Sequence, residues 1–111
     1  MTDELEFRRN ADKAIDALTK SLFAVEEEVG FEVEVQNGVL NIVFEEPPGK
    51  FVITPNAPVQ QIWISALSTS FKLDWNEPDQ SFYLPKTGEP LNGLVARLIA
   101  EHMDIDAFTL A

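Results

Sequence analysis

The spacing of apolar residues changes at Gly30, and this change limits the folds open to the chain. Over residues 2–29, apolar side chains recur every three or four positions with no Gly or Pro between them, which predicts one long amphipathic helix. Thr2 or Asp3 can cap the start of this helix, because a side-chain oxygen there accepts a bond from a free backbone N–H. Gly30 suits its end, where glycine adopts the left-handed conformation.

After Gly30, apolar and polar residues alternate, as in strands that bury one face. In residues 31–36 the apolar set Phe31, Val33 and Val35 is expected to point to one face of the sheet, and Glu32, Glu34 and Gln36 to the other. Asn37-Gly38 then predicts a two-residue hairpin turn. Further strands are expected at residues 39–44, 50–54, 60–66, 70–75 and 81–84, with a turn at 47–49.

A second helix is expected over residues 89–103, followed by an apolar tail, residues 104–111, that contains Ile105, Phe108 and Leu110. We expect this tail to fold back over the gap between the two helices. Two amphipathic helices need one surface to cover, and an antiparallel sheet needs one buried face. The sequence therefore predicts a single α+β domain over residues 1–111. It is a two-layer α/β sandwich, with one antiparallel sheet of about five to seven strands and both helices on one face.

The charge of the chain excludes several classes of function. The 111 residues include 19 acidic and 8 basic side chains, one histidine and no cysteine. A net charge of −11 disfavours binding to nucleic acid or anionic membrane. Without cysteine there is no disulfide or thiolate site. With His102 as the single histidine, expected at a helix surface, we expect no Ser-His or Cys-His catalytic arrangement. The acidic start and the lack of a long apolar run predict a soluble intracellular protein.

Trp63 lies in a strand whose isoleucines occupy the alternate positions. Ile62 and Ile64 are expected in the core, which places Gln61, Trp63 and Ser65 on the open face of the sheet. A large aromatic side chain on an open sheet face is a good anchor for a protein partner. The alternative is that a neighbouring strand or loop covers it.

Glutamates gather where the first helix meets the first strand. Glu26, Glu27 and Glu28 end the helix, and Glu32 and Glu34 follow on the outward face of the strand. Carboxylate oxygens suit hard cations, and a cation would relieve the repulsion near the negative end of the helix dipole. We expect weak, water-rich binding, with Asp12 and Asp16 further back on the helix as additional ligands. The alternative is an ordinary solvated acidic surface.

Four segments of the chain resemble the frataxin family. Residues 38–42 (Gly-Val-Leu-Asn-Ile) are similar to the family's Gly-Val-Leu-Thr-Ile, and residues 51–54 (Phe-Val-Ile-Thr) to its Tyr-Val-Ile-Asn. Residues 58–65 resemble the hallmark Pro-x-x-Gln-Ile-Trp-Leu-Ser, and residues 74–75 match its Asp-Trp. The likeness extends from about residue 7 to residue 103, in the same order and with similar spacing.

This resemblance implies the frataxin α–β-sheet–α sandwich and two sites. It implies weak binding of iron (Fe²⁺ or Fe³⁺), with other divalent cations as further candidates, at an acidic ridge to which Glu26, Glu28, Glu32 and Glu34 correspond. It also implies that the open sheet face contacts a cysteine desulfurase and an iron–sulfur scaffold protein. The residues expected in that contact are Gln61, Trp63, Ser65, Asn41 and Lys72.

The sequence also departs from the family pattern. Thr19, Lys20, Phe23 and Ala24 occupy a helix stretch that is usually acidic, and Val59 stands where eukaryotic members have Asn. The resemblance implies an iron donor or regulator of iron–sulfur cluster assembly, cytoplasmic or, if processed, in the mitochondrial matrix. Such a protein is expected to be a monomer, with iron-dependent oligomers left open. The alternatives are ferroxidase activity or an unrelated acidic interaction module like a secretion chaperone.

Overall fold

In the computed structural model, residues 4–45, 47–76, 78–106, 108 and 110 are described. The chain forms two helices, a short 3₁₀ turn and seven strands. In chain order these are α1 (Glu4–Val29), β1 (Phe31–Gln36), β2 (Val39–Glu45), β3 (Pro48–Asn56), the 3₁₀ turn (Ala57–Val59), β4 (Gln61–Ala66), β5 (Thr69–Asn76), β6 (Ser81–Leu84), β7 (Glu89–Pro90) and α2 (Leu91–Met103).

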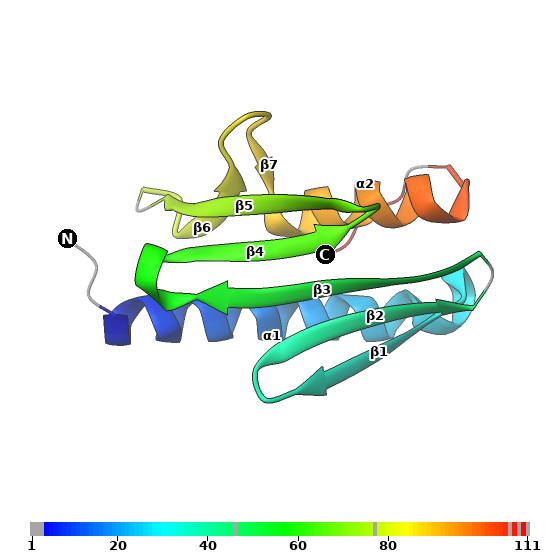
Figure 1. Cartoon of the computed structure of the whole chain (residues 1–111), viewed down its shortest axis with the longest axis horizontal. Helices are drawn as coiled ribbons and strands as arrows, with labels where there is room; N and C mark the ends of the chain where they lie inside the picture. Colours follow the sequence, from blue (N-terminus) through cyan, green and yellow to red (C-terminus); the bar gives the residue numbers. More distant parts are fainter. Residues whose placement is uncertain (1–3, 46, 77, 107, 109, 111) are drawn as a thin grey trace.

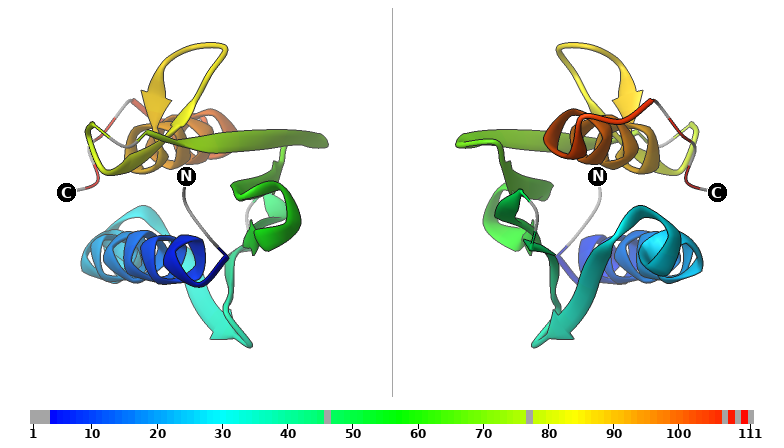
Figure 2. Two further views of the ribbon diagram at one scale, coloured as in Figure 1. Left: turned by 90° about the vertical axis from the view of Figure 1, so that its left-hand side faces the viewer. Right: turned by 90° about the vertical axis from the view of Figure 1, so that its right-hand side faces the viewer.

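The seven strands form one antiparallel sheet in which each strand pairs with the next along the chain. Strands β1 and β7 are therefore the two edges. Figure 1 shows the sheet in front of both helices, and Figure 2 shows α1 and α2 side by side behind it. The predicted α+β sandwich, with both helices on one face of an antiparallel sheet, is confirmed.

The hydrophobic core lies between the helices and the sheet. Phe7 of α1 meets Phe82 of β6 edge to face, with ring centroids 5.9 Å apart. Ile62 and Ile64 of β4 are fully buried, as their alternation predicts. From the tail, Leu110 is buried and Phe108 packs against the core, whereas Ile105 is exposed. Two of the three apolar tail residues therefore cover the core as expected.

Two hairpin turns place consecutive residues in the left-handed region. Asn37 and Gly38 have φ of 54° and 78°, which confirms the predicted turn between β1 and β2. Leu67 and Ser68 adopt the same conformation, with φ of 53° and 60°, between β4 and β5. Sequence reasoning did not find this second turn because neither residue favours positive φ.

Several predicted boundaries need correction. Strand β3 is longer than expected and starts at Pro48, which pairs with Glu45, so the turn expected at residues 47–49 is shorter. Helix α2 starts at Leu91 rather than Glu89. Pro90 has the extended ψ of 162°, and Glu89 belongs to β7, where it pairs with Leu84 of β6. The predicted caps Thr2 and Asp3 lie outside the described residues.

Val35 lies on the helix side of the sheet, the same face as Phe31 and Val33, but it is not buried. Along β1, exposure increases from the buried Phe31 through the half-buried Val33 to Val35, whose side chain is 54% exposed. Helix α1 contacts β1, but it does not cover the end of this strand (Figure 2). The period of a strand predicts which face a side chain occupies, but not whether a helix reaches it.

Candidate functional site

Trp63 stands on the face of the sheet that the helices leave open. Its cross-strand neighbours are Thr54 in β3 and Lys72 in β5. The ammonium nitrogen of Lys72 lies 4.9 Å from the centroid of the indole ring, in cation–π geometry. Trp63 is therefore half-buried. It lies on the predicted face of the sheet but is less exposed than the sequence suggests.

Gln61 fixes the orientation of the indole. The indole Nε1–H of Trp63 donates to Oε1 of Gln61 at 2.9 Å, and Nε2 of Gln61 donates to Oδ1 of Asp74 at 2.8 Å. The amide thus links the ring to a carboxylate on the neighbouring strand. A polar chain of this kind holds an aromatic side chain in one position before any partner arrives, which lowers the entropy cost of binding.

The remaining predicted partner residues lie in one row across the sheet. Glu34 pairs with Asn41, and on the next strands Asn41 pairs with Val52 and Val52 with Ser65. At the usual strand spacing, Glu34 and Ser65 are about 14 Å apart. We call Glu32 and Glu34 of β1, with Glu27 and Glu28 at the adjoining end of α1, the acidic edge. Through Glu34 it is continuous with the open face around Trp63.

Val52 and Thr54 belong to this face but were not singled out from the sequence. Both are half-buried and lie between Asn41 of β2 and the residues of β4. The alternation of β3, in which Phe51 and Ile53 are buried, was enough to assign them to the open side. They connect Asn41 of β2 with Ser65 and Trp63 of β4 on the open face.

Glu26, a predicted metal ligand, already has a partner. Its Oε2 accepts a hydrogen bond of 2.9 Å from the backbone N–H of Val33, and the carboxylate is half-buried against β1. The bond joins the last turn of α1 to the edge strand. Glu26 is therefore held more rigidly than Glu27 and Glu28, which are exposed.

The predicted metal ligands occupy three neighbouring places rather than one. Glu26, Glu27 and Glu28 end α1, and Glu32 and Glu34 lie on the open face of β1. Asp12 and Asp16 lie on an earlier part of α1, where Asp16 forms a 3.2 Å salt bridge with Lys20. Among the residues that the structure describes, no three His, Asp or Glu side chains gather closely enough to hold one ion.

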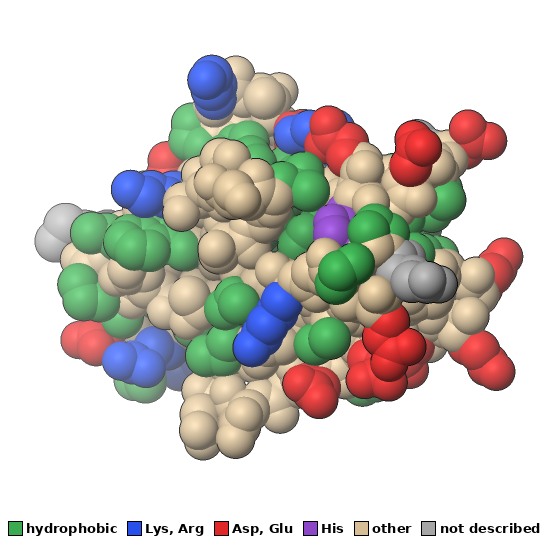
Figure 3. Space-filling model, turned by 45° about the vertical axis from the view of Figure 1, so that its right-hand side comes forward, with side chains coloured by type: hydrophobic (Ala, Val, Ile, Leu, Met, Phe, Trp, Pro, Cys, Tyr) green, Lys and Arg blue, Asp and Glu red, His purple; other side chains and the backbone are tan. Residues whose placement is uncertain are grey.

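Negative charge is concentrated at one end of the molecule. Residues 4–20 of α1 contain four acidic and four basic side chains, whereas its last four residues contain Glu26, Glu27 and Glu28 and no base. Helix α2 ends close to the end of α1, because a Cβ built on Gly30 would lie 3.9 Å from Met103 Cε. Glu101 and Asp104, at the end of α2, add further negative charge there. Figure 3 shows acidic side chains along the right of this face and basic ones mainly at its centre and left.

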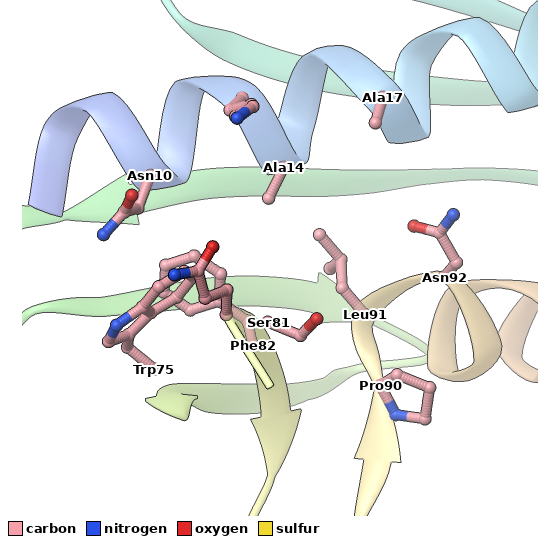
Figure 4. Close-up of a pocket in the computed structure, with 11 residues that line it drawn as sticks. Asn10, Ala14, Ala17, Trp75, Ser81, Phe82, Pro90, Leu91 and Asn92 are labelled. Atoms are coloured by element: carbon pink, nitrogen blue, oxygen red, sulfur yellow. The ribbon is translucent and has the colours of Figure 1, made fainter. Parts of the chain in front are cut away.

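A separate pocket of about 410 Å³ opens on the helix side of the sheet. The small residues Ala14 and Ala17 of α1 leave space there above Trp75 and Phe82 (Figure 4). Lys13 is the one charged side chain among the described residues that line it. The pocket lies on the opposite face of the sheet from Trp63, and the sequence did not predict it.

The chain is similar to known proteins over most of its length. Residues 1–105 match the profile of the Frataxin-like domain. It is 27% identical to the "Iron-sulfur cluster assembly protein CyaY" of Pseudomonas fluorescens (strain SBW25) over 94 residues, 83% of this chain and 84% of the relative. It is 35% identical over 66 residues to "Frataxin homolog, mitochondrial" of Schizosaccharomyces pombe, which covers 57% of this chain and 41% of that protein.

Solved frataxin structures have the same fold. Frataxin from Psychromonas ingrahamii superposes with a TM-score of 0.71 at 19% identity, covering 95% of both chains. Yeast frataxin gives a TM-score of 0.69 at 22% identity, covering 89% of this chain and 81% of that one. The chain belongs to the frataxin family, which replaces the alternative of an unrelated interaction module. In the described part of the chain, neither helix is both long and apolar enough to cross a membrane.

Proposed function

We propose that this protein acts in iron–sulfur cluster assembly, as a binding protein that docks through the open face of its sheet. The observation that carries the proposal is the fixed position of Trp63, held by Gln61 and covered by Lys72 in the middle of a face that no helix shields. Relatives named iron-sulfur cluster assembly proteins support this role. A preoriented aromatic with a charged neighbour is typical of the centre of a protein interface.

The partner in this proposal is the cysteine desulfurase with its scaffold protein, as the family resemblance implies. Docking would bury Trp63 together with Val52 and Thr54, while Asn41, Ser65 and Lys72 contribute polar contacts at the rim. Because a continuous row of residues leads from Ser65 to Glu34, a partner docked at Trp63 would have the acidic edge beside it. Metal held at that edge would therefore lie beside the assembling cluster.

Iron is cargo in this proposal, held at the acidic edge by few protein ligands. The donors there are carboxylates, which suit Fe²⁺ and Fe³⁺ as hard or borderline cations. Because three carboxylates do not meet at one point among the described residues, one or two would bind each ion and water would complete its coordination. Glu27, Glu28, Glu32 and Glu34 are exposed, whereas Glu26 is bonded to the backbone of Val33, so we assign these four the main role. Such a site releases its metal readily.

The docking half is tested with the purified desulfurase–scaffold complex. Trp63→Ala should weaken binding at least tenfold, since central aromatic residues cost about 2 kcal/mol or more when truncated. Phe23→Ala is the matched control: Phe23 is an aromatic residue, 53% exposed, on α1 away from the open face. Equal losses of affinity in the two variants, or no loss in either, would contradict docking through this face.

The iron half is tested separately by anaerobic titration with Fe²⁺ alone, followed by NMR. Paramagnetic broadening should spread from residues 27–34 and leave the amides of β5 and β6 sharp. The double variant Glu27→Gln/Glu28→Gln should weaken binding, whereas Asp79→Asn in the turn before β6 should not. Broadening that is scattered over the whole surface would refute the acidic edge as the site and leave the docking proposal standing.

A further inference from the structure

The outer edge of β1 has unpaired backbone groups. Strand β1 is the first in the sheet order and pairs on one side with β2 alone. Because the hairpin turn has two residues, the pair Gln36 and Val39 that closes it is a hydrogen-bonded pair. The alternate residues Val33 and Val35 therefore direct their N–H and C=O groups away from β2, toward the outside of the sheet.

Glu26 covers part of this edge. The N–H of Val33 donates to Glu26 Oε2 at 2.9 Å, which shows independently that this N–H faces outward. Native proteins protect edge strands with charged side chains in this way, because free N–H and C=O groups would pair with another chain. Among the described residues, no side chain covers the backbone of Val35 similarly, and its own side chain is exposed.

The two sides of this edge differ in chemistry. On the helix side, Val35 and Gly38 line a depression of about 200 Å³ together with Ile15 and Thr19 of α1 and the acidic residues Asp12 and Asp16 of the same helix. On the opposite side, Glu32 and Glu34 project as exposed carboxylates. A strand added beside β1 would place its alternate side chains next to the valines and its other side chains next to the glutamates.

We propose that the outer edge of β1 is a docking site for an extended, basic segment of a partner protein, which adds to the sheet as an eighth strand. The segment alternates apolar residues, which pack beside Val33 and Val35, with Lys or Arg, which pair with Glu32 and Glu34. Backbone bonds supply affinity and the alternating side chains supply specificity. This edge borders the open face around Trp63, and the inference does not depend on docking through that face.

Charge complementarity selects this occupant over a second copy of the chain. Antiparallel pairing of two β1 strands would bring Glu32 and Glu34 against the same residues of the other copy, and like charges directly opposite each other are destabilising. The surrounding field has the same sign, since Glu27 and Glu28 lie at the adjoining end of α1. A positively charged strand relieves that repulsion, whereas a second copy of β1 adds to it.

Glu26 limits how much of the outer edge of β1 can pair with an added strand. An added strand can bond freely at Val35, but at Val33 it must displace the carboxylate of Glu26 from the N–H. Removal of that side chain should therefore strengthen binding, although it removes a negative charge that would attract the ligand. Electrostatics alone predicts weaker binding of a basic peptide after the loss of a carboxylate. Tighter binding would therefore indicate backbone pairing.

The test uses a synthetic peptide, acetyl-Lys-Val-Arg-Val-Lys-Val-amide, and a copy that is N-methylated at every residue, so that both of its edges are blocked. The two peptides have the same charge, but the methylated one cannot pair with a strand. We expect the unmodified peptide to bind at least tenfold more tightly, and Val35→Pro to reduce that binding about tenfold, equivalent to one lost hydrogen bond. Proline is tolerated on the outward side of an edge strand, and Val35→Thr, which keeps the N–H, is the matched control.

Slowed hydrogen exchange at the Val35 amide on binding, and tighter binding by Glu26→Ala, would support the proposal. Equal affinity for both peptides would overturn it in favour of a purely electrostatic contact. Dimerisation of Glu26→Ala in light scattering without peptide would overturn it in favour of a second copy. If Val35→Pro fails to fold, the comparison of the two peptides on the unchanged protein still decides the question.

Discussion

The imidazole of His102 lies directly over Gly49: a Cβ placed on that glycine would come within 2.5 Å of the ring carbon Cε1. The ring is held there from two sides. Its Nε2 lies 2.8 Å from the carbonyl oxygen of Pro47, and its centroid lies 4.3 Å from that of Phe44. The last turn of α2 is thereby fastened to the start of β3. The only histidine of the chain is a half-buried packing residue rather than one that points into solvent.

This contact predicts that Gly49→Ala destabilises the protein. The added methyl group collides with a ring that Phe44 and the Pro47 carbonyl prevent from moving away, and overpacking of this kind costs about 1–3 kcal/mol. The free energy of unfolding in urea measures the effect. In a His102→Ala background the collision is absent. There, Gly49→Ala should lower the free energy of unfolding much less than it does in the wild-type background. Equal costs in both backgrounds would show that the ring is not the cause.

The turn between β4 and β5 predicts a stabilising change. Leu67 and Ser68 both have positive φ, a conformation that costs about 1–2 kcal/mol for a residue other than glycine, whereas Asn-Gly favours it. Replacing them with Leu67→Asn and Ser68→Gly should raise the free energy of unfolding by about 1 kcal/mol. The reverse change at the existing Asn-Gly turn, Asn37→Leu with Gly38→Ser, serves as the control and should destabilise. A loss of stability in the first variant would refute the assigned turn geometry.

Gln61→Ala should loosen the indole of Trp63 without unfolding the sheet. The substitution removes the acceptor of the 2.9 Å bond from Nε1, so exchange of the indole N–H with solvent should accelerate. Stability should fall by about 1 kcal/mol or less, the net value of one partly exposed hydrogen bond. Gln61→Glu retains the acceptor oxygen and should keep the indole protected. NMR of the indole resonance distinguishes the two variants, and an unchanged exchange rate in Gln61→Ala would contradict this role.

The ion pair between Glu89 and Arg97 predicts a dependence of stability on pH. The guanidinium of Arg97 donates two hydrogen bonds, of 2.6 and 2.9 Å, to the Glu89 carboxylate, and chiefly this contact lowers the pKa of Glu89 from its ordinary 4.5. A lowered folded-state pKa contributes stability that is present above about pH 4.5 and is lost as the pH falls through the folded value.

Glu89→Gln should therefore destabilise at pH 7 by about 0.5–1 kcal/mol, a value limited by the 43% exposure of the Arg97 side chain. The difference from wild type should stay constant down to about pH 5 and shrink below the ordinary pKa of 4.5. Denaturation in urea at several pH values measures this. Glu101→Gln removes the more exposed partner of Arg97 and should have a smaller effect. A difference that grows as the pH falls would reverse the assigned sign.

Sequence periodicity was sufficient for most of the fold. Alternation alone assigned Trp63 to the open face and Ile62 to the core, because side chains in a strand point in opposite directions at successive residues. The change of period at Gly30 located the end of α1 to the residue. Such features depend on neighbours along the chain, where local geometry allows few choices.

Features that depend on how distant segments approach each other were not predictable in this way. Nothing in the sequence shows that Glu26 bonds to the backbone of β1, or that His102 packs on Gly49, because both contacts depend on the placement of a helix end against the sheet. The exposure of Val35 has the same origin: its position in the strand pattern is apolar, but α1 does not reach it. Burial of a side chain requires a second element to pack against it, whereas periodicity describes only the element that carries the side chain.

The crowding of negative charge at the end of α1 has a consequence before any contact is made. A molecule whose charge is displaced to one end carries an electric dipole, so a basic partner turns it while the two are still separated by roughly a Debye length, about 10 Å at 0.1 M salt. The acidic end, and the edge of β1 beside it, would arrive first and in a restricted range of orientations. Added salt would then slow association far more than it speeds dissociation.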